Sequence, residues 1–271
     1  MAKAFSVASW NVEHFKNNPE RIDLIVEFMK KQNPDVLALY EVESGDVYNT
    51  LVQKMPEYHF HITEGPQTQE ILVGAKRSLT AFFTQKVEFK SGNTYLRPGA
   101  LLTIRKSDVD YILLFLHTKS SDKPIGLGLR DDMFDRAFKF KRFLDGVSKR
   151  AERGPANFIF LGDLNTMGMQ YPFKREILVD FELKKLNSGA SRCKMRRLSK
   201  NKPHTWWNGP GKYKPSDLDH VIASGHMKFR QFNGSDVDVR GWPDETSVEA
   251  QKAWIDKYSD HALLFFQIEK V

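Results

Sequence analysis

The sequence predicts a single α/β domain over residues 1–271, built from mixed β-sheets and helices. Two apolar strand-like runs, residues 4–10 and 36–40, flank a helical pattern, and this strand–helix–strand order implies a parallel pair. The runs between residues 58 and 116 follow one another without intervening helices, which is typical of antiparallel strands. The chain shows no internal repeat, no low-complexity tract and no linker that would separate two domains.

The first helix is predicted by its two ends. Asn18-Pro19 combines a capping residue with proline at the first helical position, and Asn33-Pro34 ends the pattern. Apolar residues recur between them at helical spacing, namely Ile22, Ile25, Val26 and Met29. A shorter helix is expected over residues 47–55.

The remaining elements follow from apolar runs and their boundaries. We expect strands at residues 58–62, 71–75, 79–83, 100–104, 111–116, 158–161 and 262–268, and a further strand that begins after Asp219. A loop that contains Pro124, Gly126 and Gly128 precedes a predicted helix over residues 131–150, whose apolar side chains form one broad face. Further helices are predicted at residues 176–186 and 248–257.

The composition indicates an anionic partner. The formal net charge is +7 and the sequence pI is about 9.3, which suits nucleic acid, a phosphorylated metabolite or an acidic lipid surface. The one cysteine, Cys193, cannot form an internal disulfide, which favours a reducing compartment. No run approaches the ~18 apolar residues of a transmembrane helix and no secretory signal is evident, so we expect a cytoplasmic protein. The oligomeric state is not predicted.

Residues 184–214 form a basic segment with interleaved aromatic residues. It contains ten Lys or Arg residues and no Asp or Glu, together with Trp206, Trp207 and Tyr213. This pattern suits contact with a phosphate backbone and unstacked bases. The alternative is a solvated loop whose tryptophans pack into the core.

Asp163 and Asn165 follow the predicted strand 158–161 after a glycine. Because side chains alternate along an extended chain, the two are expected to project toward the same side. A carboxylate can accept a proton or face a metal ion, and an amide can donate to a phosphate or a water. The alternative is ordinary turn chemistry after a core strand.

Polar side chains of few types stand at or beside the ends of many predicted strands. They are Asn11, Glu41, His117, Asp163, Asn165, Asp219, Asp260 and His261. Carboxylate and amide oxygens suit Mg²⁺ or Mn²⁺ better than Zn²⁺, and no paired cysteines or HExxH motif favour zinc. Serine hydrolase chemistry has no support, because no GxSxG motif is present. Asp260 and His261 must lie on a bend if both side chains face one site.

Six ordered motifs resemble those of the endonuclease/exonuclease/phosphatase superfamily, the pancreatic deoxyribonuclease-like metal-dependent phosphoesterases. The motifs are Ser9-Trp10-Asn11-Val12-Glu13, Leu39-Tyr40-Glu41-Val42, Leu116-His117-Thr118-Lys119, Gly162-Asp163-Leu164-Asn165, Asp217-Leu218-Asp219-His220 and Ser259-Asp260-His261. The resemblance covers nearly the whole chain. It implies a four-layer α/β/β/α sandwich of two mixed sheets with helices on the outside.

The resemblance also implies a metal site. Glu41 is expected to be the principal ligand, with Asn11 close by and Asp260 helping to hold the ion. The implied ion is Mg²⁺, for which Mn²⁺ is expected to substitute.

Five further residues receive catalytic roles from the resemblance. Asp163 and Asn165 are expected to orient the attacking water and the scissile phosphate. His261 would contact the phosphate and act as general base or transition-state stabiliser, while Asp219 fixes its tautomer. His117 would contact phosphate or protonate the leaving oxygen. Whether Asp163 or His261 takes the proton is left open.

Substrate contacts are less specific. Trp206 and Trp207 of the basic segment are candidates, as are Arg97, Lys119, Arg130 and Arg136, for which a salt-bridge role is an equal alternative. Two features depart from the family pattern: Tyr40 replaces a frequent Gln before Glu41, and the central segments typical of AP endonucleases are absent.

We therefore expect a Mg²⁺-dependent phosphodiesterase that hydrolyses nucleic acid, with DNA favoured, as an endonuclease or exonuclease and by direct attack of water. The alternative is a phosphatase or phosphodiesterase of phosphoinositide, sphingomyelin-type or other small phosphoesters. Salt-sensitive DNA binding would favour the first and selective binding to anionic vesicles the second. A binding protein on an inactive scaffold is disfavoured, because the polar set is intact.

Overall fold

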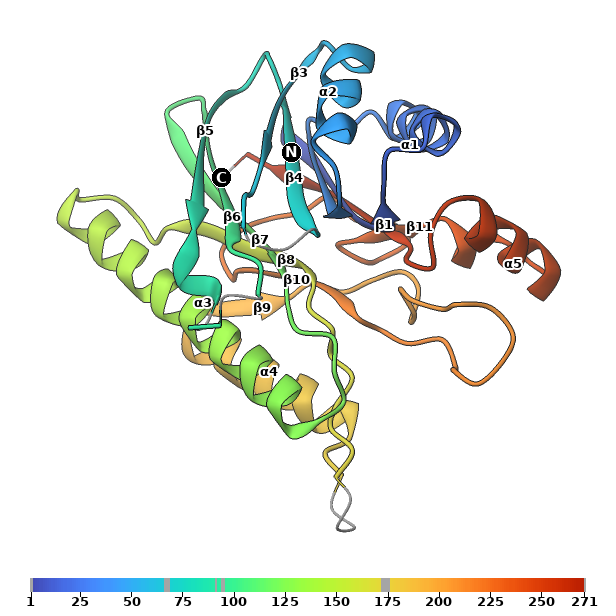
Figure 1. The fold of residues 1–271 in the computed structure, drawn as a ribbon. Helices are drawn as coiled ribbons and strands as arrows, with labels where there is room; N and C mark the ends of the chain where they lie inside the picture. The colour runs from blue at the N-terminus through green and yellow to red at the C-terminus, as the bar shows by residue number, and fades with distance from the viewer. Residues whose placement is uncertain (1, 66–68, 91, 94–95, 172–175, 271) are drawn as a thin grey trace.

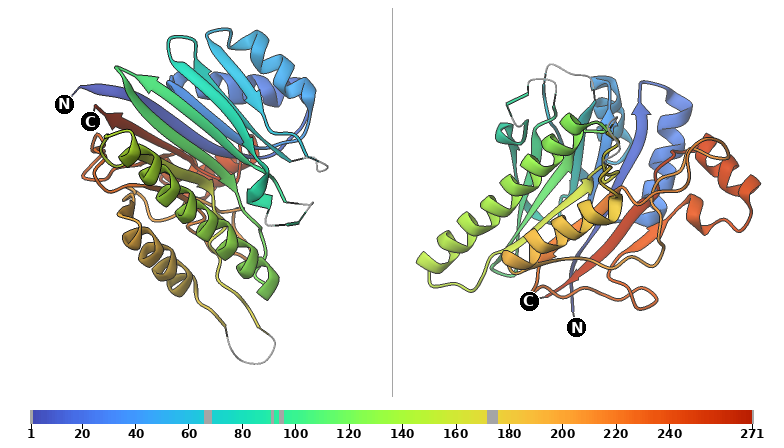
Figure 2. Two further views of the ribbon diagram at one scale, coloured as in Figure 1. Left: turned by 90° about the vertical axis from the view of Figure 1, so that its left-hand side faces the viewer. Right: turned by 90° about the horizontal axis from the view of Figure 1, so that it is seen from below.

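Two six-stranded β-sheets lie face to face, with helices on the outer side of each (Figure 1, Figure 2). The structure is a computed structural model that describes residues 2–65, 69–90, 92–93, 96–171 and 176–270. The expected four-layer α/β/β/α arrangement of two mixed sheets is confirmed. Within the described residues, no helix is long and apolar enough to cross a membrane.

The first sheet contains the predicted parallel pair. Its strands, in spatial order, are β11 (Asp238–Arg240), β12 (Leu263–Glu269), β1 (Lys3–Phe15), β2 (Val36–Val42), β4 (Glu70–Lys76) and β3 (Tyr58–Ile62). β1 and β2 run parallel, and the other neighbours are antiparallel.

The second sheet has a parallel pair at its centre. Its order is β5 (Thr80–Lys86), β6 (Gly99–Lys106), β7 (Val109–His117), β8 (Asn157–Asp163), β10 (Asp219–Ser224) and β9 (Met195–Arg197). β7 and β8 are parallel, and a long helix joins them. The strands between residues 58 and 117 are antiparallel as expected, but they are divided between the two sheets.

The helices cover opposite faces. α1 (Pro19–Gln32) and α2 (Gly45–Lys54) pack on the first sheet, while α3 (Pro124–Arg150) and α4 (Val179–Arg192) pack on the second. α5 (Val248–Lys257) lies beside the first sheet in Figure 1. Asn18 caps α1, as predicted: its side chain accepts a hydrogen bond from the backbone N–H of Arg21.

One predicted loop is wrong, because α3 begins at Pro124 and not at residue 131. Proline is compatible with the first helical position. Gly126 is accommodated in the helix because the backbone of the preceding loop comes close to it. A Cβ at Gly126 would lie 2.3 Å from the carbonyl oxygen of Ser121. The glycine therefore allows the preceding loop to approach the helix, and it does not interrupt the helix.

The basic segment is divided among several elements. It contributes the second half of α4, the edge strand β9 and a loop that returns to Ser216 next to Trp206. β9 and β11, which the sequence did not predict, are three-residue strands at sheet edges. Such short runs carry too few residues for a periodic signal.

Candidate active site

Register within the second sheet aligns three of the predicted residues on adjacent strands. His117 of β7 pairs with Asp163 of β8, and Asp163 pairs with Asp219 of β10. Side chains of residues in register stand on the same face of a sheet. The sheet therefore presents two carboxylates and an imidazole in one row, at one end of three adjacent strands.

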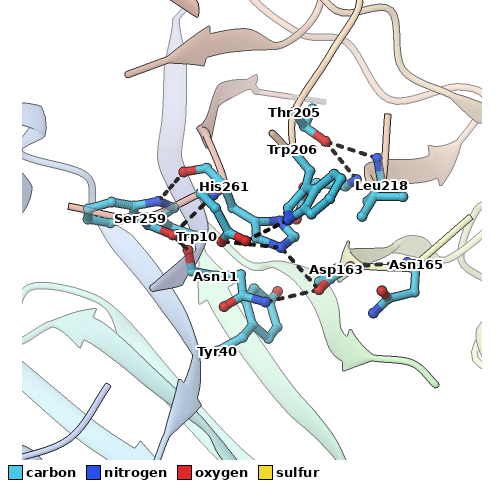
Figure 3. A network of polar contacts seen from close by, with 12 residues as sticks. Trp10, Asn11, Tyr40, Asp163, Asn165, Thr205, Trp206, Leu218, Ser259 and His261 are labelled. Carbon is cyan, nitrogen blue, oxygen red and sulfur yellow. Dashed lines mark hydrogen bonds and ion pairs between the residues drawn. The ribbon is translucent and has the colours of Figure 1, made fainter. Parts of the chain in front are cut away.

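Asn11 joins this row to the first sheet. Its amide nitrogen donates to Glu41 Oε1 at 3.1 Å and to Asp163 Oδ2 at 2.9 Å, and Figure 3 shows its side chain pointing toward Asp163. Asn11 is buried, and Glu41 follows the residue that pairs with Asn11 on β2. The predicted residues of both sheets thus meet in one cluster.

The backbone around this junction is bent into an uncommon conformation. Glu13, His14 and Glu41 have φ values of 45°, 47° and 62°, and the β1–β2 register shifts between Asn11 and Phe15. The left-handed region costs a residue with a side chain ~1 kcal/mol or more. Glu41 Oε2 offsets part of this cost by accepting the backbone N–H of His14 at 3.0 Å.

Gly162 lets the two sheets approach each other beside the site. Its φ is +134°, and a Cβ there would lie 2.2 Å from the carbonyl oxygen of Leu116 and 2.6 Å from the Tyr40 hydroxyl. Tyr40, the departure from the family pattern, is fully buried and its hydroxyl lies 3.0 Å from Ser9 Oγ. Tyr40 therefore fills the space between the sheets.

Asp163 and Asn165 project from a tight turn after β8. Asp163 Oδ1 accepts the backbone N–H of Asn165 at 3.0 Å, and the Asn165 amide donates to the carbonyl of Thr118 at 3.2 Å. Burial raises the pKa of Asp163 to about 7, with His261 opposing and Asp219 adding to the shift. This carboxyl can therefore both take and release a proton near neutral pH.

His261 is held by Asp219. Its Nδ1 lies 2.9 Å from Asp219 Oδ2, and its Nε2 lies 3.7 Å from Asp163 Oδ2. Burial lowers the pKa of His261, but Asp219 and Asp163 more than offset that effect and leave the pKa well above its usual value. Trp10 fixes the backbone here, since its indole donates to the His261 carbonyl at 2.9 Å (Figure 3).

Asp260 lies on a bend, as the sequence required, and its Oδ1 lies 4.0 Å from His261 Nε2. Its Oδ2 accepts the indole N–H of Trp206 at 2.6 Å, whereas its buried Oδ1 has no hydrogen-bond partner among the described residues. Burial raises the pKa of Asp260. A buried carboxylate oxygen without a donor is an environment that a cation would satisfy.

His117 lies between the carboxylates. Its Nε2 is 3.4 Å from Asp163 Oδ2 and 3.7 Å from Glu41 Oε1. Complete burial, followed by the charges of Arg97 and His261, lowers the pKa of His117 well below its usual value. The imidazole is therefore neutral at pH 7, which allows it to donate a hydrogen bond but not to act as an imidazolium acid.

Two groups of residues near this junction offer metal ligands. The sequence points to Asn11, Glu41 and Asp260, whose donor set of carboxylates and an amide suits a hard cation. Ligand atoms of Asp163, Asp219 and His261 also lie within 4.8 Å of one another. In that second group, the Asp219–His261 hydrogen bond already uses the imidazole Nδ1 and Asp219 Oδ2.

The predicted substrate contacts differ in exposure. Arg97 is half-buried and donates to the Gln69 carbonyl at 2.9 Å, and Lys119 is half-buried on the loop after β7. Gln69, which the sequence analysis did not identify, donates to Glu41 Oε2 at 3.2 Å. Gln69 lies in a loop without periodicity, so only its position in the fold connects it to the site.

Direct contact with substrate does not hold for Arg130 and Trp207. Arg130 is fully buried, and its guanidinium donates to the Glu182 carboxylate and to three backbone carbonyls. Trp207 is buried against Trp242, with ring centroids 5.8 Å apart. Both side chains therefore have structural roles, which agrees with the alternatives of a salt bridge for Arg130 and core packing for Trp207. Trp206 stays at the site through its bond to Asp260.

Solved structures share this fold at low sequence identity. Truncated TDP2 from Caenorhabditis elegans is 17% identical with a TM-score of 0.63, over 98% of this chain and 97% of that one. D. rerio TDP2 complexed with single strand DNA product is 15% identical, with a TM-score of 0.63 and 98% of both chains covered. The mannosyl-6-phosphatase Bt3783 of Bacteroides thetaiotaomicron is 13% identical, with a TM-score of 0.60 over 98% of this chain and 99% of that one. At these identities the likeness establishes the fold alone.

The sequence has no significant match among curated proteins. The profile of the Endonuclease/Exonuclease/phosphatase family, however, matches residues 8–261, which include all six motifs. Members of this family hydrolyse phosphoester bonds with divalent metal ions. The chain belongs to the endonuclease/exonuclease/phosphatase family.

Proposed function

We propose that this protein is a Mg²⁺-dependent phosphodiesterase that hydrolyses nucleic-acid phosphodiester bonds, with DNA as the substrate, by direct attack of water. The observation that carries the proposal is the meeting of Asp163 with both the Asn11–Glu41 pair and the Asp219–His261 pair. A metal-ligand set and an acid–base pair thereby face one space, and phosphoryl transfer by water requires both.

Asn11, Glu41 and Asp260 would hold the Mg²⁺ ion, for which Mn²⁺ would substitute. Their fit rests on the donor types and on the buried Oδ1 of Asp260, which has no hydrogen-bond partner among the described residues and lies 4.0 Å from His261 Nε2. When bound, the ion supplies positive charge that stabilises the charge developing on the phosphate oxygens. Trp206 and Gln69 orient two of these ligands through their hydrogen bonds.

Asp163 and His261 supply the acid–base and hydrogen-bonding groups for the attack of water on the phosphate. The pKa of Asp163 is about 7, so a large fraction of its carboxyl is ionised at neutral pH and can accept that proton. His261 is protonated under the same conditions, and its Nε2–H can donate to a phosphate oxygen. We therefore assign the base to Asp163 and the phosphate contact to His261, with Asp219 holding the ring through Nδ1.

The amide of Asn165 and the neutral ring of His117 complete the set as hydrogen-bond donors. His117 touches Asp163 and Glu41 and has a depressed pKa. We propose that it steadies the phosphate or the leaving oxygen through a hydrogen bond. Arg97 and Lys119 would add positive charge at the rim of the site.

The choice of nucleic acid rests on charge and aromatic exposure. The chain carries a net charge of +7, and Trp206 lies at the site next to Tyr213, at a centroid distance of 6.1 Å. A similar fold in D. rerio TDP2 was solved with a single strand DNA product. The second candidate is a small phosphoester, because a mannosyl-6-phosphatase has a similar fold.

The test compares end-labelled single- and double-stranded DNA with phosphoinositide vesicles, sphingomyelin and mannose 6-phosphate, each in Mg²⁺, Mn²⁺ and EDTA. We expect metal-dependent cleavage of DNA that falls at least 100-fold in His261→Ala, the scale of a lost acid–base group. Arg230→Gln, which changes an exposed arginine that is not among the site residues, is the matched control and should retain activity. Faster turnover of a small phosphoester than of DNA would overturn the nucleic-acid assignment.

A further inference from the structure

A groove lies on the outer side of the second sheet, between α4, the edge strand β9 and the segment that follows β9. We call it the β9 groove; its volume is about 500 Å³. The lining residues that matter here are Asn187, Arg196, Arg197, Lys200, Lys202 and Asp217. None of the residues assigned to the active site is among the described residues that line it, so it is a separate surface.

The floor of the β9 groove holds two cations that share one carboxylate. Lys200 Nζ pairs with Asp217 Oδ1, and Arg197 Nη1 lies 3.6 Å from Asp217 Oδ2. In the part of the chain that the structure describes, no second carboxylate forms an ion pair with either cation. The Lys200 side chain is 6% exposed and that of Arg197 is 26% exposed, so water screens the surplus charge weakly.

The other two cations of the groove are each balanced. Arg196 pairs with Asp236, and Lys202 pairs with Asp244. The groove therefore has one positive charge that no carboxylate balances, and it resides on Lys200 and Arg197, which share Asp217. Because an unmatched charge away from water is unfavourable, a bound anion would stabilise this arrangement.

His220 shows that the floor is electropositive. Its Nδ1 lies 3.3 Å from Arg197 Nη1 and 3.4 Å from Lys200 Nζ. Burial, followed by these two cations, lowers the pKa of His220 well below its usual value. The ring is therefore neutral and leaves the charge of the floor unchanged.

Hydrogen-bond donors also face the groove. Asn187 Oδ1 accepts from Arg197 Nε at 3.1 Å, so the NH₂ end of this amide is available to a ligand. A guanidinium and an amide together suit the tetrahedral oxygens of a phosphate group. We propose that the β9 groove binds a phosphate group of a polyanionic ligand.

The groove touches the active site through one strand. Lys200 Nζ donates to the backbone carbonyl of Asp219 at 2.6 Å. Ile222 of the same strand packs with residues of α3 and α4, and His220, two residues before it, shares that face. Alternation along β10 thus places the active site on one face and the groove on the other. The proposal goes beyond the proposed hydrolysis, because anion binding here requires neither metal nor turnover.

The experiment measures binding to the whole protein in EDTA, where the proposed hydrolysis is absent. Inorganic pyrophosphate is titrated by calorimetry and a labelled single-stranded DNA oligonucleotide by fluorescence anisotropy. Arg197→Gln should weaken binding about tenfold, the scale of one charge-assisted hydrogen bond, and Asp217→Asn should tighten it. Arg230→Gln removes the same charge from an exposed arginine that is not part of the groove lining and should leave binding unchanged.

The two probes distinguish the source of the phosphate. If Arg197→Gln weakens and Asp217→Asn tightens binding of the oligonucleotide, the groove contacts nucleic acid. If the two variants change the binding of pyrophosphate only, the ligand is a small phosphorylated molecule. Equal binding by all four proteins, or no binding of either probe, would overturn the proposal. Either failure leaves the hydrolase unaffected, because catalysis is measured separately with metal.

Discussion

Among the substitutions we consider, removal of the buried Arg130 guanidinium should decrease the free energy of unfolding the most. Its guanidinium donates to Glu182 at 2.6 and 3.1 Å, to the Ser121 and Lys119 carbonyls at 2.7 and 3.2 Å, and to the Gly168 carbonyl at 2.8 Å. These contacts tie α3 and α4 to the loops that follow β7 and β8. The first of these loops contains Lys119, and the two loops directly follow His117 and Asp163. The Arg130–Glu182 ion pair therefore stabilises the segments next to the active site.

Arg130→Met should reduce the free energy of unfolding by ~3–5 kcal/mol, because the Glu182 carboxylate would stay buried without its partner. Glu182→Leu should cost a similar amount through the unpaired guanidinium. The double variant leaves three carbonyls and the Gly168 N–H without partners, at ~1 kcal/mol each. Its cost should therefore be ~4 kcal/mol, well below the sum of ~8 kcal/mol that independent sites would give.

Urea denaturation of the four proteins measures this coupling. Arg136→Met is the matched control, since Arg136 lies on the same helix in an exposed pair with Asp132 at 2.7 Å and should cost under ~1 kcal/mol. Additive costs of the Arg130 and Glu182 variants, or a cost for Arg130→Met no larger than that of the control, would refute the reasoning.

Three further predictions concern the site and the core. Gly162→Ala should destabilise the protein by ~3 kcal/mol or more, because the new Cβ meets backbone at 2.2 Å and the Tyr40 hydroxyl at 2.6 Å; an unchanged melting temperature would contradict this. His220 is neutral in the folded state and has a pKa well below its usual value, so the unfolded chain binds more protons below pH ~6.5 and the free energy of unfolding should fall as the pH drops from 7.5 to 5.5. His220→Asn should make that dependence shallower, and parallel pH profiles of the two proteins would count against it. Trp206→Phe should lower kcat about tenfold with little change in KM, because it removes the donor to Asp260 Oδ2 while keeping the ring; unchanged kcat in steady-state assays would remove the indole from the mechanism.

The sequence was sufficient for the elements that carry strong local signals. α1 is marked by Asn18-Pro19 and by four apolar residues at helical spacing, and the structure places it at Pro19–Gln32. The α5 prediction, residues 248–257, agrees with the structure. By contrast, Gly126 at the start of α3 was interpreted as part of a loop, because its role is to admit the Ser121 carbonyl and that contact is non-local.

The same distinction holds for the site. The polar residues at strand ends were identifiable because their types are chemically restricted, and the structure brings Asn11, Glu41 and Asp163 into hydrogen-bonded contact. Gln69 was not identifiable, because nothing near it in the sequence shows that its loop reaches Glu41. Arg130 was a candidate phosphate contact with a salt bridge as the equal alternative. The sequence shows its charge but not its buried partner, Glu182, which is distant along the chain.

The most direct test of the central claim is nicking of supercoiled plasmid in Mg²⁺ by the wild-type protein and by His261→Ala, with EDTA and Arg230→Gln as controls. We predict nicking by the wild type and by Arg230→Gln, its loss in EDTA, and a decrease of at least 100-fold in His261→Ala. Nicking that survives in His261→Ala would show that the junction of Asp163, Asp219 and His261 is not the catalytic centre. The absence of nicking by the wild type in both Mg²⁺ and Mn²⁺ would exclude an endonuclease and leave the exonuclease as the remaining nuclease activity.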